Sequence, residues 1–119
     1  MKTILTPEES RRLIDLGVDT KLASKRTLGV QIPTGIPNVY HKKEGGDPIF
    51  TLADLLSILP KEIKGYHLEM GTNDDEWYAE YDSVRLKDSY TLAPELIDAL
   101  YQLLIWAIEN GYVKPNKDN

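Results

Sequence analysis

The chain has 119 residues and a formal net charge of −5, with 41% hydrophobic and 28% charged residues. This length suits one domain, and the composition excludes a wholly disordered chain. The net acidity argues against a general polyanion binder, because nucleic-acid binding depends on Lys and Arg. The chain contains no cysteine, which excludes disulfides, thiol nucleophiles and thiolate metal sites.

The apolar segments are too short for a signal peptide or a membrane span, so we expect a cytoplasmic protein. The longest of them, residues 96–108, has 11 apolar positions among 13 and is interrupted by Asp98 and Gln102. Spanning a bilayer takes about 20 such residues. We therefore expect this segment to form a buried helix, and we expect the protein to have no contact with a membrane.

The chain begins with a helix-start pattern. Thr6 is placed to cap a helix with Glu9 three residues on, and Gly17 suits a left-handed stop. Asp19 can cap one further short turn. We expect residues 1–26 to form a helical N-terminal part, with a helix-turn-helix as the less favoured alternative.

A hairpin is predicted next. Residues 27–32 alternate apolar and polar side chains, residues 33–37 contain Pro and Gly, and residues 39–43 suit a returning strand. We expect these strands to join the main sheet. Residues 44–48 contain the clearest break in the chain, and we expect a mobile loop there.

A second helix is predicted from Thr51, which has Asp54 three residues on in a second capping box. Pro60 should end this helix near Leu59. Its apolar face consists of Leu52, Leu55, Leu56 and Leu59.

A central hairpin is predicted from residues 66–70 and 77–82. We expect Gly71 to pair with Glu76 across a four-residue loop, which sets His67 opposite Glu80. Residues 84–87 either extend the second strand or bend away. The predicted apolar face contains Tyr66, Leu68, Met70, Trp77, Ala79 and Tyr81. The other face contains His67, Glu69, Tyr78, Glu80 and Asp82.

The last helix is predicted over residues 91–110, with Pro94 in its first turn and Asn110–Gly111 as its stop. Only a narrow polar stripe interrupts its apolar surface, so the helix should be covered on more than one side. Residues 114–119 should form a frayed polar tail.

Two groups of residues are candidates for interaction. The first is an acidic hairpin surface, which is either a partner-binding face, a metal or catalytic site, or simply solvated. It consists of Glu69, Asp74, Asp75, Glu76, Tyr78, Glu80 and Asp82. The second lies on the last helix and either packs internally or forms a homodimer. It consists of Tyr101, Ile105 and Trp106.

Sequence motifs for catalysis are missing. No serine lies in a G-x-S-x-G elbow, no phosphate-binding or dinucleotide fingerprint is present, and neither histidine has zinc-ligand spacing. We therefore predict no catalytic residue, metal or cofactor, and a protein that is not an enzyme. The alternative is a small carboxylate enzyme or metal-binding protein, whose residues would be Glu69, Glu80, Asp82 and His67.

The segments TLADLLSILPKEI (51–63) and ELIDALYQLLIW (95–106) resemble a group of small uncharacterised proteins from Bacteroidetes genomes and prophages. Residues 5–18 and 77–81 belong to the same pattern. The resemblance covers most of the chain outside residues 27–47 and assigns no catalytic residue. It implies an intracellular accessory protein of the mobile-element type, often non-enzymatic.

Charge is distributed unevenly along the chain. Residues 1–43 hold 8 Lys and Arg against 4 Asp and Glu, or +4, whereas residues 44–119 hold 6 against 15, or −9. This polarity can attract the two parts of the domain to each other or orient a charged partner. A local basic patch is conceivable at Lys21, Lys25, Arg26, Lys42 and Lys43.

The sequence therefore predicts a single α+β domain with an antiparallel β-sheet and helices packed on one face. Its predicted function is a non-enzymatic binding or regulatory protein that acts through an unidentified protein partner. Weak nucleic-acid contact through the basic N-terminal third is a further alternative.

Overall fold

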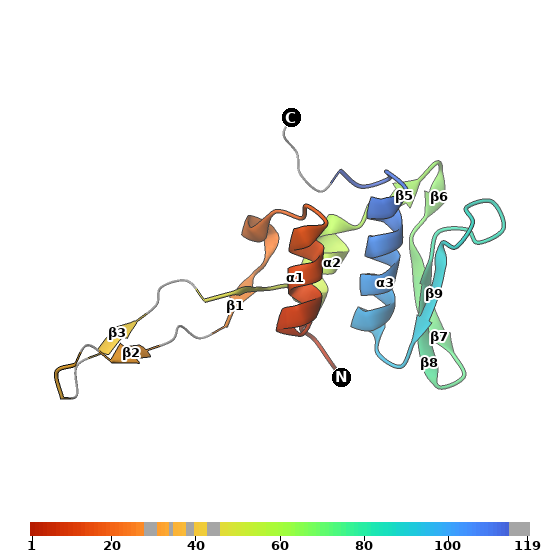
Figure 1. Cartoon of the computed structure of the whole chain (residues 1–119). Helices are drawn as coiled ribbons and strands as arrows, with labels where there is room; N and C mark the ends of the chain where they lie inside the picture. The colour runs from red at the N-terminus through yellow and green to blue at the C-terminus, as the bar shows by residue number, and fades with distance from the viewer. Residues whose placement is uncertain (28–30, 34, 38–39, 43–45, 115–119) are drawn as a thin grey trace.

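The computed structural model describes residues 1–27, 31–33, 35–37, 40–42 and 46–114 (Figure 1). The helices are α1 (Pro7–Asp15), the short 3₁₀ turn η1 (Thr20–Leu22), α2 (Leu52–Ile58) and α3 (Leu96–Glu109). The first strands are β1 (Lys25–Arg26), β2 (Gln31–Pro33), β3 (Tyr40–Lys42), β4 (Pro48–Ile49) and β5 (Glu62–Ile63). The later strands are β6 (Tyr66–His67), β7 (Glu69–Asn73), β8 (Glu76–Glu80) and β9 (Tyr90–Ala93).

The helices lie on one side of the three-stranded antiparallel sheet β7–β8–β9 (Figure 1). Helix α3 lies directly against the sheet, and α1 and α2 lie behind α3. The predicted α+β fold, with helices packed on one face of an antiparallel sheet, is confirmed. This layering explains the wide apolar surface of α3, because the sheet covers one side of it and α2 packs on another.

Helix α3 supplies much of the hydrophobic core. The side chains of this helix that are buried are Leu96, Ile97, Ala99, Leu100, Leu103, Leu104 and Ala107. Among the described residues, no buried side-chain nitrogen or oxygen lacks a hydrogen-bond partner. The core is therefore apolar, and its few polar groups are paired.

Both predicted capping boxes are present. The Thr6 hydroxyl accepts the Glu9 amide at 3.1 Å, and the Glu9 carboxylate accepts the Thr6 amide at 2.9 Å. Thr51 and Asp54 repeat this arrangement at the start of α2. The predicted apolar face of α2 is wrong at Leu56, which is 39% exposed, because only one side of this short helix packs on α3.

Asp54 also ties α2 to the chain before β1. Its carboxylate accepts hydrogen bonds from the Ser24 hydroxyl and, at 2.8 Å, from the Ser24 amide. Burial raises the pKa of Asp54, but the hydrogen bonds from Ser24 and Thr51 outweigh it and hold the pKa below its ordinary value. This buried carboxylate is therefore ionised and structural.

Ion pairs connect the basic N-terminal part with the acidic remainder. Lys2 Nζ lies 2.7 Å from Asp98, and Arg12 lies 4.0 Å from Glu109. A third pair, Lys2 with Glu9 at 3.0 Å, lies within the N-terminal part itself. Burial lowers the pKa of Lys2, but its bonds to Asp98 and Glu9 raise it above the ordinary value. Part of the opposite charge of the two regions is thus neutralised within the domain, by ion pairs that join N-terminal residues to α3.

The predicted helix over residues 91–110 is wrong at its start, because Tyr90–Ala93 form the third strand. Trp77 pairs with Ala93 and Ala79 pairs with Thr91. The Thr91 hydroxyl lies 2.7 Å from the Ala99 carbonyl and fixes the strand to α3. Pairing with β8 overrides the local helix pattern, and α3 begins only after Glu95.

The register of the central hairpin differs from the prediction by two residues. Asn73 pairs with Glu76, and Met70 pairs with Ala79, around a two-residue turn in which Asp74 has a φ of 58°. Aspartate tolerates this left-handed conformation, and two-residue turns are the commonest hairpin connections. A shift of two residues leaves the side chains of β7 and β8 on their predicted faces.

Strands β2 and β3 pair with each other. The prediction that they join the main sheet is wrong, because they form a separate two-stranded sheet. We call this hairpin the arm, because it lies away from the helices (Figure 1). Residues 28–30, 34, 38–39 and 43–45, with part of the expected mobile loop, lie outside the described residues. Thr27 holds Asp47 at the root of the arm through hydrogen bonds of 2.8 and 2.9 Å.

Candidate functional site

One face of the sheet β7–β8–β9 packs on α3, and no helix in the described part of the chain covers the other face (Figure 1). Alternation along each strand divides the side chains between these two faces. Ala79, Thr91 and Ala93 are buried on the helix side. We call the opposite side the open face. It contains Glu69, Gly71, Asn73, Glu76, Tyr78, Glu80, Tyr90 and Leu92.

Two tyrosines form the centre of the open face. The rings of Tyr78 and Tyr90 are stacked, with centroids 5.8 Å apart and planes 15° apart. A side chain at Gly71 would meet the Tyr78 ring at 3.0 Å, so glycine is what lets this ring lie over β7. Tyr90 is 37% exposed and Leu92 is 39% exposed, which leaves an apolar surface in contact with water.

Carboxylates surround the tyrosines. Glu69 and Glu80 are directly opposite each other on neighbouring strands, an arrangement that is destabilising for like charges. Asp74 and Asp75 lie in the turn at the end of the hairpin, and Glu76 follows them. Among the described residues, none of these five carboxylates has an ion-pair partner.

Asp82 was predicted on the acidic surface, but the structure gives it a local role. Its carboxylate accepts the amides of Val84 and Arg85 at 3.0 and 3.1 Å and so shapes the turn after β8. The hydrogen bond from Arg85 is the main reason that the pKa of Asp82 lies below its ordinary value. Residues 84–87 accordingly bend away and do not extend the strand.

The prediction that His67 lies opposite Glu80 is wrong. His67 pairs with Glu62 in the small β5–β6 hairpin, where its Nδ1 lies 3.6 Å from the Glu62 carboxylate. The structure therefore separates His67 from the opposed pair Glu69 and Glu80. In the described part of the chain, no group of three or more His, Asp and Glu is arranged to hold a metal ion.

Tyr101, Ile105 and Trp106 are half-buried and pack against the core. The Trp106 indole donates to the Lys87 carbonyl at 2.9 Å, and its ring lies 5.3 Å from Tyr112. Burial raises the pKa of Tyr101. The residues predicted for self-association thus have contacts within the chain.

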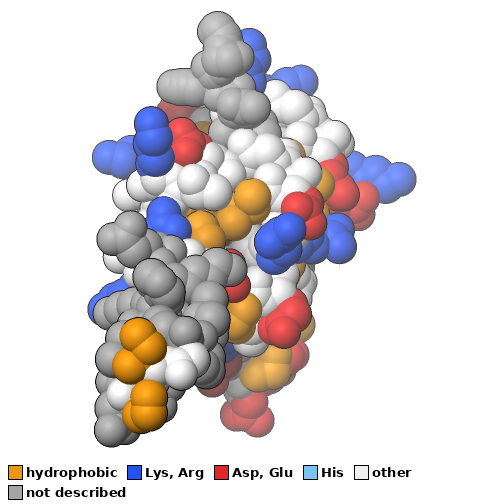
Figure 2. Space-filling view, turned by 60° about the vertical axis from the view of Figure 1, so that its left-hand side comes forward, with side chains coloured by type: hydrophobic (Ala, Val, Ile, Leu, Met, Phe, Trp, Pro, Cys, Tyr) orange, Lys and Arg blue, Asp and Glu red, His pale blue; other side chains and the backbone are white. Residues whose placement is uncertain are grey.

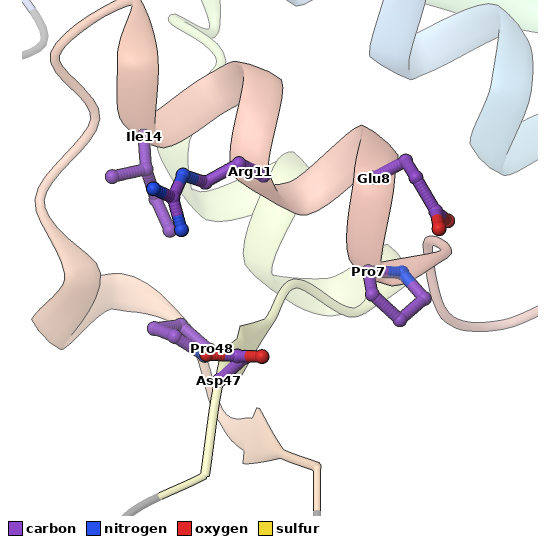
Figure 3. Close-up of a pocket in the computed structure, with 6 residues that line it drawn as sticks. All are labelled: Pro7, Glu8, Arg11, Ile14, Asp47 and Pro48. Atoms are coloured by element: carbon purple, nitrogen blue, oxygen red, sulfur yellow. The ribbon is translucent and has the colours of Figure 1, made fainter.

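A second candidate region lies on the opposite side of the molecule. A hollow of about 240 Å³ separates α1 from β4, and its lining includes Pro7 and Glu8. Arg11 and Ile14 extend from α1 toward Asp47 and the strand residue next to it (Figure 3). Of the predicted basic patch, Lys21, Lys25 and Arg26 are exposed, Lys42 lies in β3 of the arm, and Lys43 lies outside the described residues.

Sequence reasoning missed the two residues that β9 contributes to the open face, Tyr90 and Leu92. Both fall in or beside the segment predicted as the first turns of the last helix. The segment gives no usual strand signal, because the exposed residues are Tyr90 and Leu92 whereas the polar residue Thr91 is buried.

Comparison of the chain with protein-family models, with curated proteins and with solved structures finds no match. The resemblance to the Bacteroidetes and prophage group therefore stays a prediction. No helix within the described residues has the length and apolar character needed to cross a bilayer. The open face is the feature of the molecule that points to a function.

Proposed function

We propose that the chain is a non-enzymatic cytoplasmic accessory protein that binds a basic segment of a protein partner on the open face. The observation that carries this proposal is the opposed pair Glu69 and Glu80 beside the stacked tyrosines, on a face that holds no Lys or Arg. This role is in keeping with the resemblance to small accessory proteins of mobile elements.

Electrostatics favours a cationic partner. Two like charges held opposite each other destabilise a sheet, so a cation placed between Glu69 and Glu80 relieves a cost that the free protein bears. Asp74 and Asp75 add negative charge at the edge of the face and so further attract a cationic partner.

The tyrosine pair favours arginine as the partner's cation. A guanidinium is planar, stacks on aromatic rings and presents donors that fit carboxylates, whereas an ammonium is a compact and strongly hydrated charge. Exposed Leu92 adds apolar surface next to the rings. An open face of this kind suits a protein segment, because small ligands bind in concave sites.

The test is binding of a labelled peptide that contains arginine and leucine, measured by fluorescence anisotropy. We expect Glu80→Gln to weaken binding about tenfold, which corresponds to about 1.4 kcal/mol. The matched control is Glu62→Gln, which removes an exposed carboxylate outside the open face and should change the affinity less than about twofold. Equal binding of an uncharged peptide, or equal losses in both variants, would contradict the proposal.

A further inference from the structure

The open face has a counterpart of opposite character at the root of the arm. A hollow of about 490 Å³ lies there, bordered by exposed Lys25 and Arg26. We call it the arm-root site. Its lining residues are Thr3, Ile4, Leu5, Pro7, Lys25, Arg26, Thr27 and Ile49.

Backbone hydrogen bonds hold the walls of the arm-root site in place. The Leu5 amide donates to Phe50 and the Leu52 amide donates to Thr3, each at 2.9 Å, along one edge of the segment that follows β4. Strand β1 pairs with the other edge of β4. Both walls are therefore anchored to the same segment, which gives the site a defined shape.

The arm-root site combines positive charge with exposed apolar surface. Lys25 is exposed and has no ion-pair partner among the described residues. Ile4, which lines the site, is 47% exposed. Figure 2 shows hydrophobic side chains beside Lys and Arg on this side of the molecule. The open face carries the complementary mixture of carboxylates and aromatic rings.

The two surfaces cannot meet within one molecule. The sheet β7–β8–β9 lies at one end of the chain's body and β1 lies toward the other, with α3, α2 and α1 between them (Figure 1). Their opposite charges can be neutralised only by another molecule. A second copy of the chain brings both the acidic open face and the basic arm-root site.

We infer that the open face of one copy docks in the arm-root site of a second copy. The two surfaces of this contact are different, so the association is head-to-tail: each copy keeps one surface free, and further copies add to give chains or a closed ring. Self-association then covers the open face and competes with the basic partner. Only this competition rests on the proposed function.

Sedimentation velocity over a range of protein concentrations tests the inference. We expect the wild-type chain to associate at about 0.01 M salt, where charges act over about 30 Å, and to dissociate at about 1 M salt, where they act over about 3 Å. Glu80→Lys alters the open face and Lys25→Glu alters the arm-root site. Each variant alone should associate at least about tenfold more weakly than wild type.

Mixing the two variants gives the decisive result. Each variant keeps one intact surface, so an equimolar mixture should recover association through the unaltered pair, and the two reversed charges in the mixture attract each other and do not oppose it. Lys61→Glu reverses an exposed charge outside both surfaces and should associate like wild type. Glu69→Lys provides a second open-face variant if Glu80→Lys does not fold.

Two results would overturn the inference: a wild-type chain that stays monomeric at low salt, or a mixture in which association does not recover. Either result leaves the proposed function standing, because peptide binding to the open face is measured separately on a dilute monomer. Conversely, loss of peptide binding with intact self-association would reject the proposed partner alone.

Discussion

The two faces of the sheet β7–β8–β9 belong to the same strands but differ in the burial of their side chains and in the partners that these side chains have. On the face that α3 covers, Ala79 is buried and the Thr91 hydroxyl has carbonyl partners. On the open face, Glu69 opposes Glu80 and two tyrosines meet water. Arrangements that cost stability, such as opposed carboxylates, are expected mainly at functional sites. The difference therefore separates residues that hold the fold from residues available to a partner.

Truncation of the covered side should have the largest effect. Leu103 is fully buried in α3, and Leu103→Ala leaves a cavity that should cost about 3 kcal/mol of unfolding free energy. Chemical denaturation followed by circular dichroism measures this loss. An effect below about 1 kcal/mol would mean that the core collapses around the cavity and is less rigidly packed than the burial indicates.

Loss of the Asp54 carboxylate should have the next largest effect. Asp54→Asn removes the charge that accepts three hydrogen bonds from Ser24 and Thr51, so we expect a loss of about 2 kcal/mol at neutral pH. The open-face variant Glu80→Gln is the comparison, and it should be nearly neutral.

The effect of Asp54 should also depend on pH. Its folded-state pKa lies below the ordinary value, so its contribution is present above the unfolded pKa of about 3.9 and is lost as pH falls through the folded pKa. The stability difference between wild type and Asp54→Asn should therefore shrink in acid. A difference that stays constant from neutral to acid pH would contradict this assignment.

The tyrosine stack should contribute less. A double-mutant cycle of Tyr78→Leu and Tyr90→Leu should give a coupling of about 1 kcal/mol, because aromatic pairs add to the area that they bury. Thermal or urea denaturation of the four proteins supplies the numbers. A coupling near zero would show that stacking of the two rings adds nothing to folding beyond what each ring contributes alone.

Charge reversal on the open face should have the smallest effect on stability, and in the opposite direction. Glu80→Lys places a cation opposite Glu69 and should stabilise the fold by about 0.5 kcal/mol. The same change should abolish binding of the basic peptide. A destabilised Glu80→Lys variant would mean that the opposed carboxylates are not strained in the free protein.

Features set by near neighbours in the chain were predictable. The capping boxes at Thr6 and Thr51 join atoms three residues apart, so their patterns are visible locally. The division of the central hairpin into two faces survived an error in register, because the error was two residues and the side-chain period is also two. The partner of His67 was missed because it lies in another strand, β5.

The amino-acid sequence alone determined where α1 and α2 begin, and it determined an α3 too apolar to be covered on one side only. Tertiary structure decided that Tyr90–Ala93 form a strand, because strand hydrogen bonds need the amides and carbonyls of β8. It also decided that Tyr78, Tyr90 and Leu92 share an exposed surface. Helix α3 covers only one face of a three-stranded sheet, and which side chains remain on the other face follows from pairing across strands.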